Sequence, residues 1–203
     1  MRTLYIILII SLLSLYCKAQ NPILSLEDNS AWGAKANTYF KDINNAIDPF
    51  VGVWVYEDGA ISLRLELKKV TQFYNGVFYE DLIVGEYQYD KNGQTVISTL
   101  ENLNNSTIKS NEHMVHGHSI LKDCDLWPAS DCTNGEKRLL VNLKDVLKET
   151  IYYQLLLHKR TINGGAALKV VFNPHTSVVS IKEGETVEEP TIPLWGEYVF
   201  YKQ

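Results

Sequence analysis

Hydrophobic and polar residues alternate along most of the chain after residue 50. In the clearest run, residues 61–68, every second residue is Ile or Leu and the residues between them are polar. Successive side chains of a strand point to opposite faces, so this run predicts a strand with one buried face. By the same reasoning we predict strands at residues 50–57, 60–74, 77–90, 94–101, 113–121, 136–144, 150–161, 167–173, 177–182 and 196–202.

Short turn signals lie next to these runs. Asn-Gly or Asp-Gly dipeptides occur at residues 58–59, 75–76, 92–93, 134–135 and 163–164. Such dipeptides favour two-residue hairpin turns, so strands that are neighbours in sequence should pair antiparallel. The sequence therefore predicts a mainly β fold, an up-and-down meander of about eight to ten strands. A closed barrel and a sandwich are both possible, and we favour the barrel because closure removes exposed strand edges.

The hydrophobic period differs before residue 50. Ser30 is a suitable N-cap, and Asp48-Pro49 ends the segment because the residue before proline avoids the helical region. Between them, hydrophobic residues recur every three to four positions, at Trp32, Ala36, Tyr39, Phe40, Ile43 and Ile47. This spacing predicts one amphipathic helix, or two short ones, within an N-terminal segment at residues 20–49, followed by the barrel domain at 50–203.

The first residues are typical of a secretory signal. Residues 4–15 are apolar or small, a length that suits the core of a signal peptide and is too short to span a membrane. We expect residues 1–19 to be removed before Gln20, which gives an exported protein, periplasmic or extracellular, with no transmembrane segment in the mature chain. Lipidation of Cys17 is an alternative, although the bulky Tyr16 before it disfavours this.

Composition excludes several classes of protein. Of the 203 residues, 45% are hydrophobic and 21% are charged, which excludes an intrinsically disordered chain. The chain has 19 Lys and Arg against 24 Asp and Glu. This acidic balance disfavours nucleic acid as a partner, because phosphate binding needs clustered basic residues.

Two cysteines and an aromatic residue mark the loop at residues 122–135. In an oxidising compartment Cys124 and Cys132 are expected to form a disulfide. A disulfide orders a loop in advance, which makes the enclosed Trp127 and Pro128 candidates for contact with a ligand or partner. The alternative is that Trp127 folds back as a lid on one end of the barrel.

Histidines cluster at residues 113–118. On a strand, His116 and His118 point to one face and His113 to the other, so His116 and His118 could begin a metal site. The nearby sequence supplies no third ligand, and an exposed polar strand face is the simpler interpretation. The sequence contains none of the common motifs of hydrolases, metalloproteases or nucleotide-binding enzymes. We therefore lean against an enzyme and predict no cofactor.

Short stretches of the sequence resemble two known protein families. Gly52-Val53-Trp54 resembles the Gly-x-Trp at the start of lipocalins, where the Trp closes the base of a barrel. Several short stretches resemble a family of secreted flavobacterial proteins known only as a domain of unknown function. They are Cys17–Gln20, Ile47–Trp54, Leu65–Lys69, Gly85–Tyr87 and Lys202. That resemblance implies a bacterial envelope or secreted setting and a lipocalin-like architecture, with no activity attached.

Together these features lead to three hypotheses. The first is an exported, non-enzymatic binding module that holds a small apolar ligand inside the barrel, or contacts a protein or glycan partner through residues 122–135. The second is a metal-binding protein or metal-assisted enzyme built on His116 and His118. The third is an envelope structural protein without a ligand.

Overall fold

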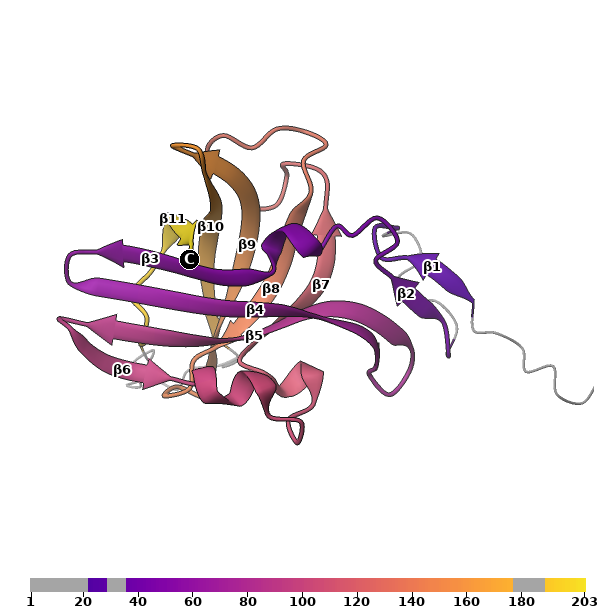
Figure 1. The fold of residues 1–203 in the computed structure, drawn as a ribbon, viewed down its shortest axis with the longest axis horizontal. Coiled ribbons are helices and arrows are strands. Elements are labelled where there is room, and N and C mark those ends of the chain that lie inside the picture. Colours follow the sequence, from indigo (N-terminus) through magenta and orange to yellow (C-terminus); the bar gives the residue numbers. More distant parts are fainter. Residues whose placement is uncertain (1–21, 29–35, 177–188) are drawn as a thin grey trace, which may run out of the picture.

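A closed antiparallel barrel forms the body of the molecule (Figure 1). The structure, a computed structural model, describes residues 22–28, 36–176 and 189–203. Within these residues, eight strands close into the barrel. They are β3 (Gly52–Asp58), β4 (Ile61–Tyr74), β5 (Tyr79–Lys91), β7 (Val115–Leu121), β8 (Arg138–Lys144), β9 (Ile151–Ile162), β10 (Gly165–Thr176) and β11 (Gly196–Lys202).

Two pairings turn the meander into a closed ring. The last strand, β11, pairs with the first, β3, where Tyr201 lies opposite Val55. On the other side of the ring, β5 pairs with β7, and Ile83 lies opposite Gly117. The prediction of a mainly β, lipocalin-like barrel is thereby confirmed, and the sandwich alternative is not the fold.

Two glycines near the junction of β5 and β7 allow close contact with the strands on the other side of each, β4 and β8. A Cβ added to Gly85 would lie 2.5 Å from the carbonyl oxygen of Glu66, and one added to Gly117 would lie 2.5 Å from that of Leu140. Both distances are shorter than any ordinary contact, so a larger residue would push neighbouring strands apart. Glycine in a strand often marks such a close backbone approach.

One predicted strand lies outside the ring. β6 (Gln94–Ser98) pairs with the end of β5 and not with β7, so the barrel skips it. Two short 3-10 helices follow, η3 (Leu100–Asn104) and η4 (Ser110–Glu112), and η3 replaces the end of the strand predicted at 94–101. The strand predicted at 177–182 lies outside the described residues.

The predicted N-terminal helix is wrong over the residues that the structure describes. Residues 36–47 contain turns and the short strand β2 (Tyr39–Lys41), which pairs in parallel with β1 (Ile23–Ser25) and with β5. Asn37 and Asn45 have φ values of 65° and 52°, outside the helical region. A three-residue 3-10 helix, η2 (Asp48–Phe50), leads into β3. Residues 29–35 are not described.

Tertiary contacts explain why the helical spacing did not produce a helix. The Asp42 carboxylate accepts hydrogen bonds from the backbone N–H groups of Ala46 and Ile47, which fixes a turn there. It also forms an ion pair with Lys69 of β4, at 2.7 Å. Phe40, Ala46 and Ile47 of this segment pack into the barrel core as parts of a strand and a turn, whereas Ile43 is exposed.

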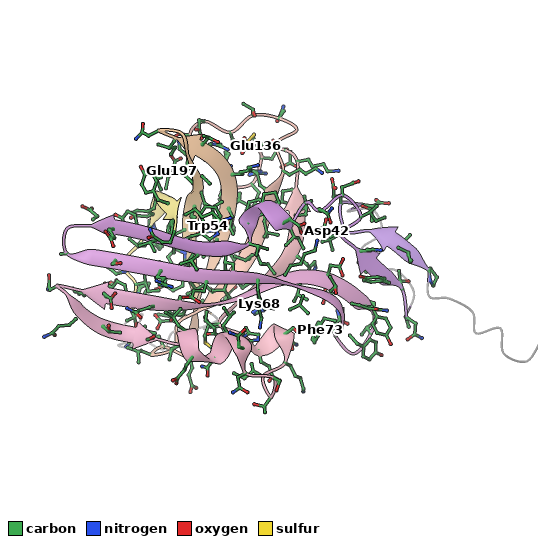
Figure 2. The ribbon with its side chains drawn as sticks, viewed as in Figure 1. Asp42, Trp54, Lys68, Phe73, Glu136 and Glu197 are labelled. Carbon is green, nitrogen blue, oxygen red and sulfur yellow. A yellow bond between two sulfur atoms is a disulfide. The ribbon has the colours of Figure 1, made fainter. Side chains whose placement is uncertain are left out.

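Large side chains fill the interior of the barrel. Trp54, Tyr87, Tyr153 and Phe200 each expose 1% of their surface or less. Trp54 lies among the interior side chains (Figure 2), and its indole N–H donates to the Phe50 carbonyl at 2.8 Å. Filling by bulky residues is usual for a barrel of eight strands. These contacts leave little space in the interior for a ligand.

Candidate binding groove

Outward-facing residues of β7, β8 and β9 form cross-strand rows on the outside of the barrel. In one row, His116 lies opposite Asn142, which lies opposite Gln154. In the next row, Lys144 lies opposite Tyr152, whose other neighbour is His175 of β10. The alternate residues of these strands face the core, so their spacing places polar and aromatic side chains together on one outer wall.

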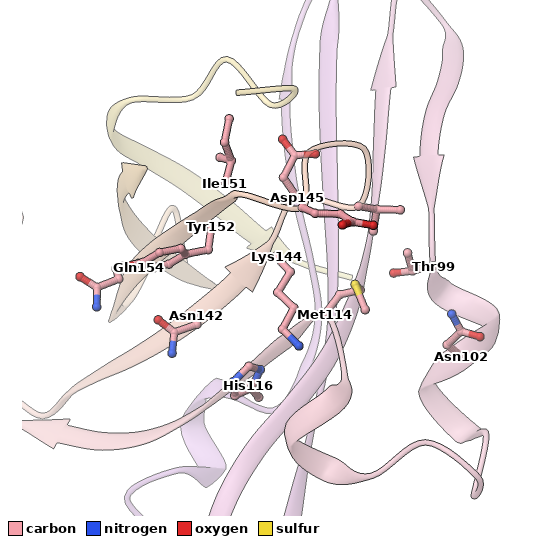
Figure 3. A pocket seen from close by; sticks show the side chains of 12 residues that line it. Thr99, Asn102, Met114, His116, Asn142, Lys144, Asp145, Ile151, Tyr152 and Gln154 are labelled. Carbon is pink, nitrogen blue, oxygen red and sulfur yellow. The ribbon is translucent and has the colours of Figure 1, made fainter. Parts of the chain in front are cut away.

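A groove of about 870 Å³ lies over these rows (Figure 3). Its floor is formed by β7, β8 and β9, and its sides by η3, Met114 and the turn between β8 and β9. This volume is in the upper part of the range for small-molecule sites. Within the close-up view, the Lys144 side chain extends toward His116.

Three polar groups on the floor of the groove lack partners in the part of the chain that the structure describes. Neither the amides of Asn142 and Gln154 nor the ammonium of Lys144 has a hydrogen-bond or ion-pair partner among the described residues. Asp145, in contrast, is fully engaged, because it accepts the N–H groups of Leu147 and Thr191 at 3.0 and 2.8 Å. Glu149 also lines the groove, where it is exposed and has no partner among the described residues, so the groove offers free donors and acceptors together with one exposed carboxylate.

His116 is half-buried at the edge of the groove. Its Nδ1 lies 3.2 Å from the carbonyl oxygen of His113. Because a carbonyl only accepts, Nδ1 carries the proton and Nε2 remains an acceptor. Burial lowers the pKa of His116, and the nearby ammonium of Lys144 acts in the same direction, so the ring is neutral at pH 7.

The other two histidines of the cluster have separate acidic partners. His118 Nδ1 lies 2.9 Å from Glu80, and His113 Nδ1 lies 2.7 Å from the buried Glu86. In the described part of the chain, neither His116 nor His118 belongs to a compact group of three potential metal ligands. The metal site predicted on His116 and His118 stays a prediction, without a third ligand to complete it.

The group that is compact enough for a metal does not fit one. Cys132, Glu136 and His158 have ligand atoms within 4.8 Å of one another. However, the Cys132 sulfur is bonded to Cys124. His158 Nε2 accepts the Ala129 N–H at 3.3 Å, so Nδ1 carries the proton and donates it to Glu136 at 2.5 Å. No thiolate and no free imidazole nitrogen remain there to bind a metal.

The predicted disulfide between Cys124 and Cys132 is present. It closes the 122–135 loop, which lies against the outer wall over the ends of β8 and β9. Ala129 is buried on His158, and Asp131 forms an ion pair with Arg160 at 2.8 Å. Hydrogen bonds to Arg160 and Lys169 hold the pKa of Asp131 well below its usual range.

Trp127 lies at the end of a row of rings on this wall. Its ring centroid is 5.6 Å from that of His175, which in turn stacks on Tyr152 at 5.4 Å. Trp127 is half-buried and its neighbour Pro128 is exposed. The structure thus connects two of the candidates from the sequence, since Trp127 ends a row that begins at Tyr152, and Tyr152 and His116 both line the groove.

Sequence reasoning missed most of the groove. Asn142, Lys144, Tyr152 and Gln154 carry no motif, and only their alternation with buried residues on β8 and β9 marks them as outward-facing. That pattern could have grouped them if the register of β8 and β9 had been inferred from the turn between them. His175 could not have been linked to Trp127 by any spacing in the sequence.

The fold and the groove define a class of small β-barrel proteins with a filled interior and a polar groove on the outer wall. A family model described as a family of unknown function, DUF6705, matches residues 1–203, and the chain belongs to that family. No curated protein and no solved structure matches the chain. In the described residues no helix is long and apolar enough to cross a membrane.

Proposed function

We propose that the protein is an exported, non-enzymatic binding module whose ligand lies in the groove on the outer wall. One observation carries this proposal, namely the unpartnered amides of Asn142 and Gln154 on the floor of a groove of about 870 Å³. Polar side chains that lack protein partners in a concave site are available to orient a ligand. The filled interior favours this site over an apolar ligand inside the barrel.

The 122–135 loop supports the same proposal. Its disulfide and its contacts with β9 hold Trp127 in place before any ligand arrives. A rigid aromatic side chain loses little conformational entropy on binding, which makes it an efficient contact. In this proposal, a ligand that extends beyond the groove along Tyr152 and His175 reaches Trp127 and Pro128.

Native mass spectrometry of the protein exported by its own host tests the proposal. The protein is mixed with the small-molecule and oligosaccharide fraction of the culture medium and measured without refolding. We expect a bound species that is lost on denaturation, and a polypeptide mass that begins at Gln20. A lipid on Cys17 would instead show an anchored form of the same module.

Two variants then locate the ligand. The double variant Asn142→Ala and Gln154→Ala should lose the bound species, whereas Gln94→Ala, an exposed amide on β6 outside the groove, should retain it. Retention of the ligand by the double variant would place the site elsewhere. A bare polypeptide mass under all conditions would favour a structural protein of the envelope.

A further inference from the structure

Among the described residues, the groove contains a cation without an acidic partner, Lys144. Lys144 extends outward from β8, and its ammonium has no acidic partner among residues that the structure describes. The chain as a whole has a net charge of −5. On the same wall Lys169 lies 2.8 Å from Glu197 and 3.1 Å from Asp131. A groove lysine that has no acidic partner in the described part of the chain therefore points to an anionic group on the ligand.

An aromatic ring faces the same space. His175 lies on the β10 side of Tyr152 and stacks on it with an angle of 14° between the ring planes. Lys144 lies on the opposite side of Tyr152, on β8. The ring face that is not stacked on His175 is therefore directed toward β8 and the groove. The face of an aromatic ring carries partial negative charge, which attracts the polarised C–H groups of a sugar ring.

Amides complete the set of contacts. Asn142 and Gln154 lie opposite each other in register, one row away from Lys144 and Tyr152. Each amide offers two donor hydrogens and one acceptor oxygen, a combination that matches the hydroxyl groups of a sugar. His116 adds an acceptor at Nε2, since its Nδ1 hydrogen is used by the His113 carbonyl.

We infer that the groove binds an acidic saccharide through Lys144, Tyr152 and the two amides. A sugar carboxylate accepts a charge-assisted hydrogen bond from Lys144, one face of the sugar ring lies on Tyr152, and the hydroxyl groups bond to Asn142 and Gln154. An aromatic acid would leave the amides unused, and a neutral sugar would leave Lys144 unused. This inference rests on the proposed function and adds the chemical class of the ligand.

Isothermal titration with defined sugars tests the inference. The probes are trimers of glucuronate, galacturonate and mannuronate, each paired with its carboxyl-reduced neutral counterpart. We expect at least one uronate trimer to bind, and its neutral counterpart to bind about 10-fold or more weakly, because one charge-assisted hydrogen bond is lost. The preference should weaken at high salt, since Lys144 is exposed to solvent.

Variants of Lys144 give the decisive comparison. Lys144→Gln should bind the uronate as weakly as the neutral sugar, and Lys144→Arg should keep the preference. Lys91→Gln, an exposed lysine outside the groove at the end of β5, is the matched control and should behave as the unmodified protein does. Equal affinity for acidic and neutral trimers, or an unchanged preference in Lys144→Gln, would overturn the inference.

The two proposals can fail separately. If no uronate trimer binds while native mass spectrometry shows a different species lost from the Asn142 and Gln154 variant, the acidic saccharide is wrong and the binding module stands. If no species is found by either method, both proposals are wrong. Binding of uronates that is unaffected by the Asn142 and Gln154 changes would place the sugar at another surface, which also overturns this inference.

Discussion

The outer wall formed by β8, β9 and β10 has two halves, which differ in whether their outward-facing side chains are covered and paired. The loop-covered half comprises Arg138, Leu156, His158, Arg160 and Lys169. The groove half comprises His116, Asn142, Lys144, Tyr152 and Gln154. Both halves consist of outward-facing residues, yet the first is covered and paired, and the second is accessible and largely unpaired.

In the loop-covered half, polar groups neutralise one another. His158 is held between Glu136 and the Ala129 N–H, and Arg160 bonds to both Asp131 and Glu136. Burial would raise the pKa of Glu136, but its hydrogen bonds to His158 and Arg160 outweigh burial and lower it. These groups hold the loop, whereas the polar groups of the groove half remain available to a ligand. The difference between the halves thus separates side chains that hold the structure from side chains that stay accessible on the same strands.

Replacing Leu156 with Ala should give the largest difference between the two halves. Leu156 faces outward but is completely buried, two residues before His158, so Leu156→Ala should lower the free energy of unfolding by about 2–5 kcal/mol. Gln154→Ala, two residues away in the groove half, should change it by less than about 0.5 kcal/mol. Urea unfolding measures both values. Similar small effects for both variants would mean that Leu156 is not packed as a buried residue in the folded protein.

The sequence predicted the strands and the residues that face the core, but it did not predict which outward-facing residues are buried. Alternation in residues 61–68 and 151–157 predicted which residues face the core, and the Asn-Gly turns predicted the order of pairing. The same alternation places Leu156 and His158 on the outer face, where a sequence argument expects exposure. Both are buried, and His158 is held by a loop more than twenty residues earlier in the chain, whose Ala129 N–H it accepts.

The helix prediction for the N-terminal segment was wrong for a related reason. The spacing of its apolar residues fits a helix, but those residues pack against strands that are distant in sequence. Asp42 fixes a turn through Ala46 and Ile47, and such side-chain hydrogen bonds to backbone compete directly with helix formation. The groove was missed because its residues come from three strands and carry no shared motif.

Lowering the pH should reduce the free energy of unfolding through His158 in the loop-covered half. Burial lowers the pKa of His158 below its ordinary value of 6.5, even though the hydrogen bond to Glu136 acts in the opposite direction. Below pH 6.5 the unfolded chain therefore takes up a proton that the folded protein resists, and the free energy of unfolding falls as the pH falls. The decline contributed by one such histidine is at most about 1.4 kcal/mol per pH unit.

Unfolding measured by urea between pH 7.5 and about 5 checks this contribution. His158→Gln should show a shallower decline than the unmodified protein, and His116, whose pKa is also lowered, should account for part of the remaining slope. Acids such as Glu136 and Glu197 have lowered pKa values, so their contributions are lost only at more acidic pH, below about 4.5. An identical slope in His158→Gln would show that this histidine does not oppose protonation in the folded protein.

The smallest expected difference concerns the two lysines of the wall. Lys169 lies between Glu197 and Asp131 and is largely shielded from solvent, so Lys169→Gln should cost about 0.5–1 kcal/mol of unfolding free energy. Lys144→Gln should cost nothing measurable, because Lys144 has no ion-pair partner among the described residues. Repeating both measurements in about 1 M salt should shrink the Lys169 effect and leave that of Lys144 at zero. If Lys144→Gln destabilised the free protein as much as Lys169→Gln does, Lys144 would have a structural partner, and the distinction between the two halves would no longer hold.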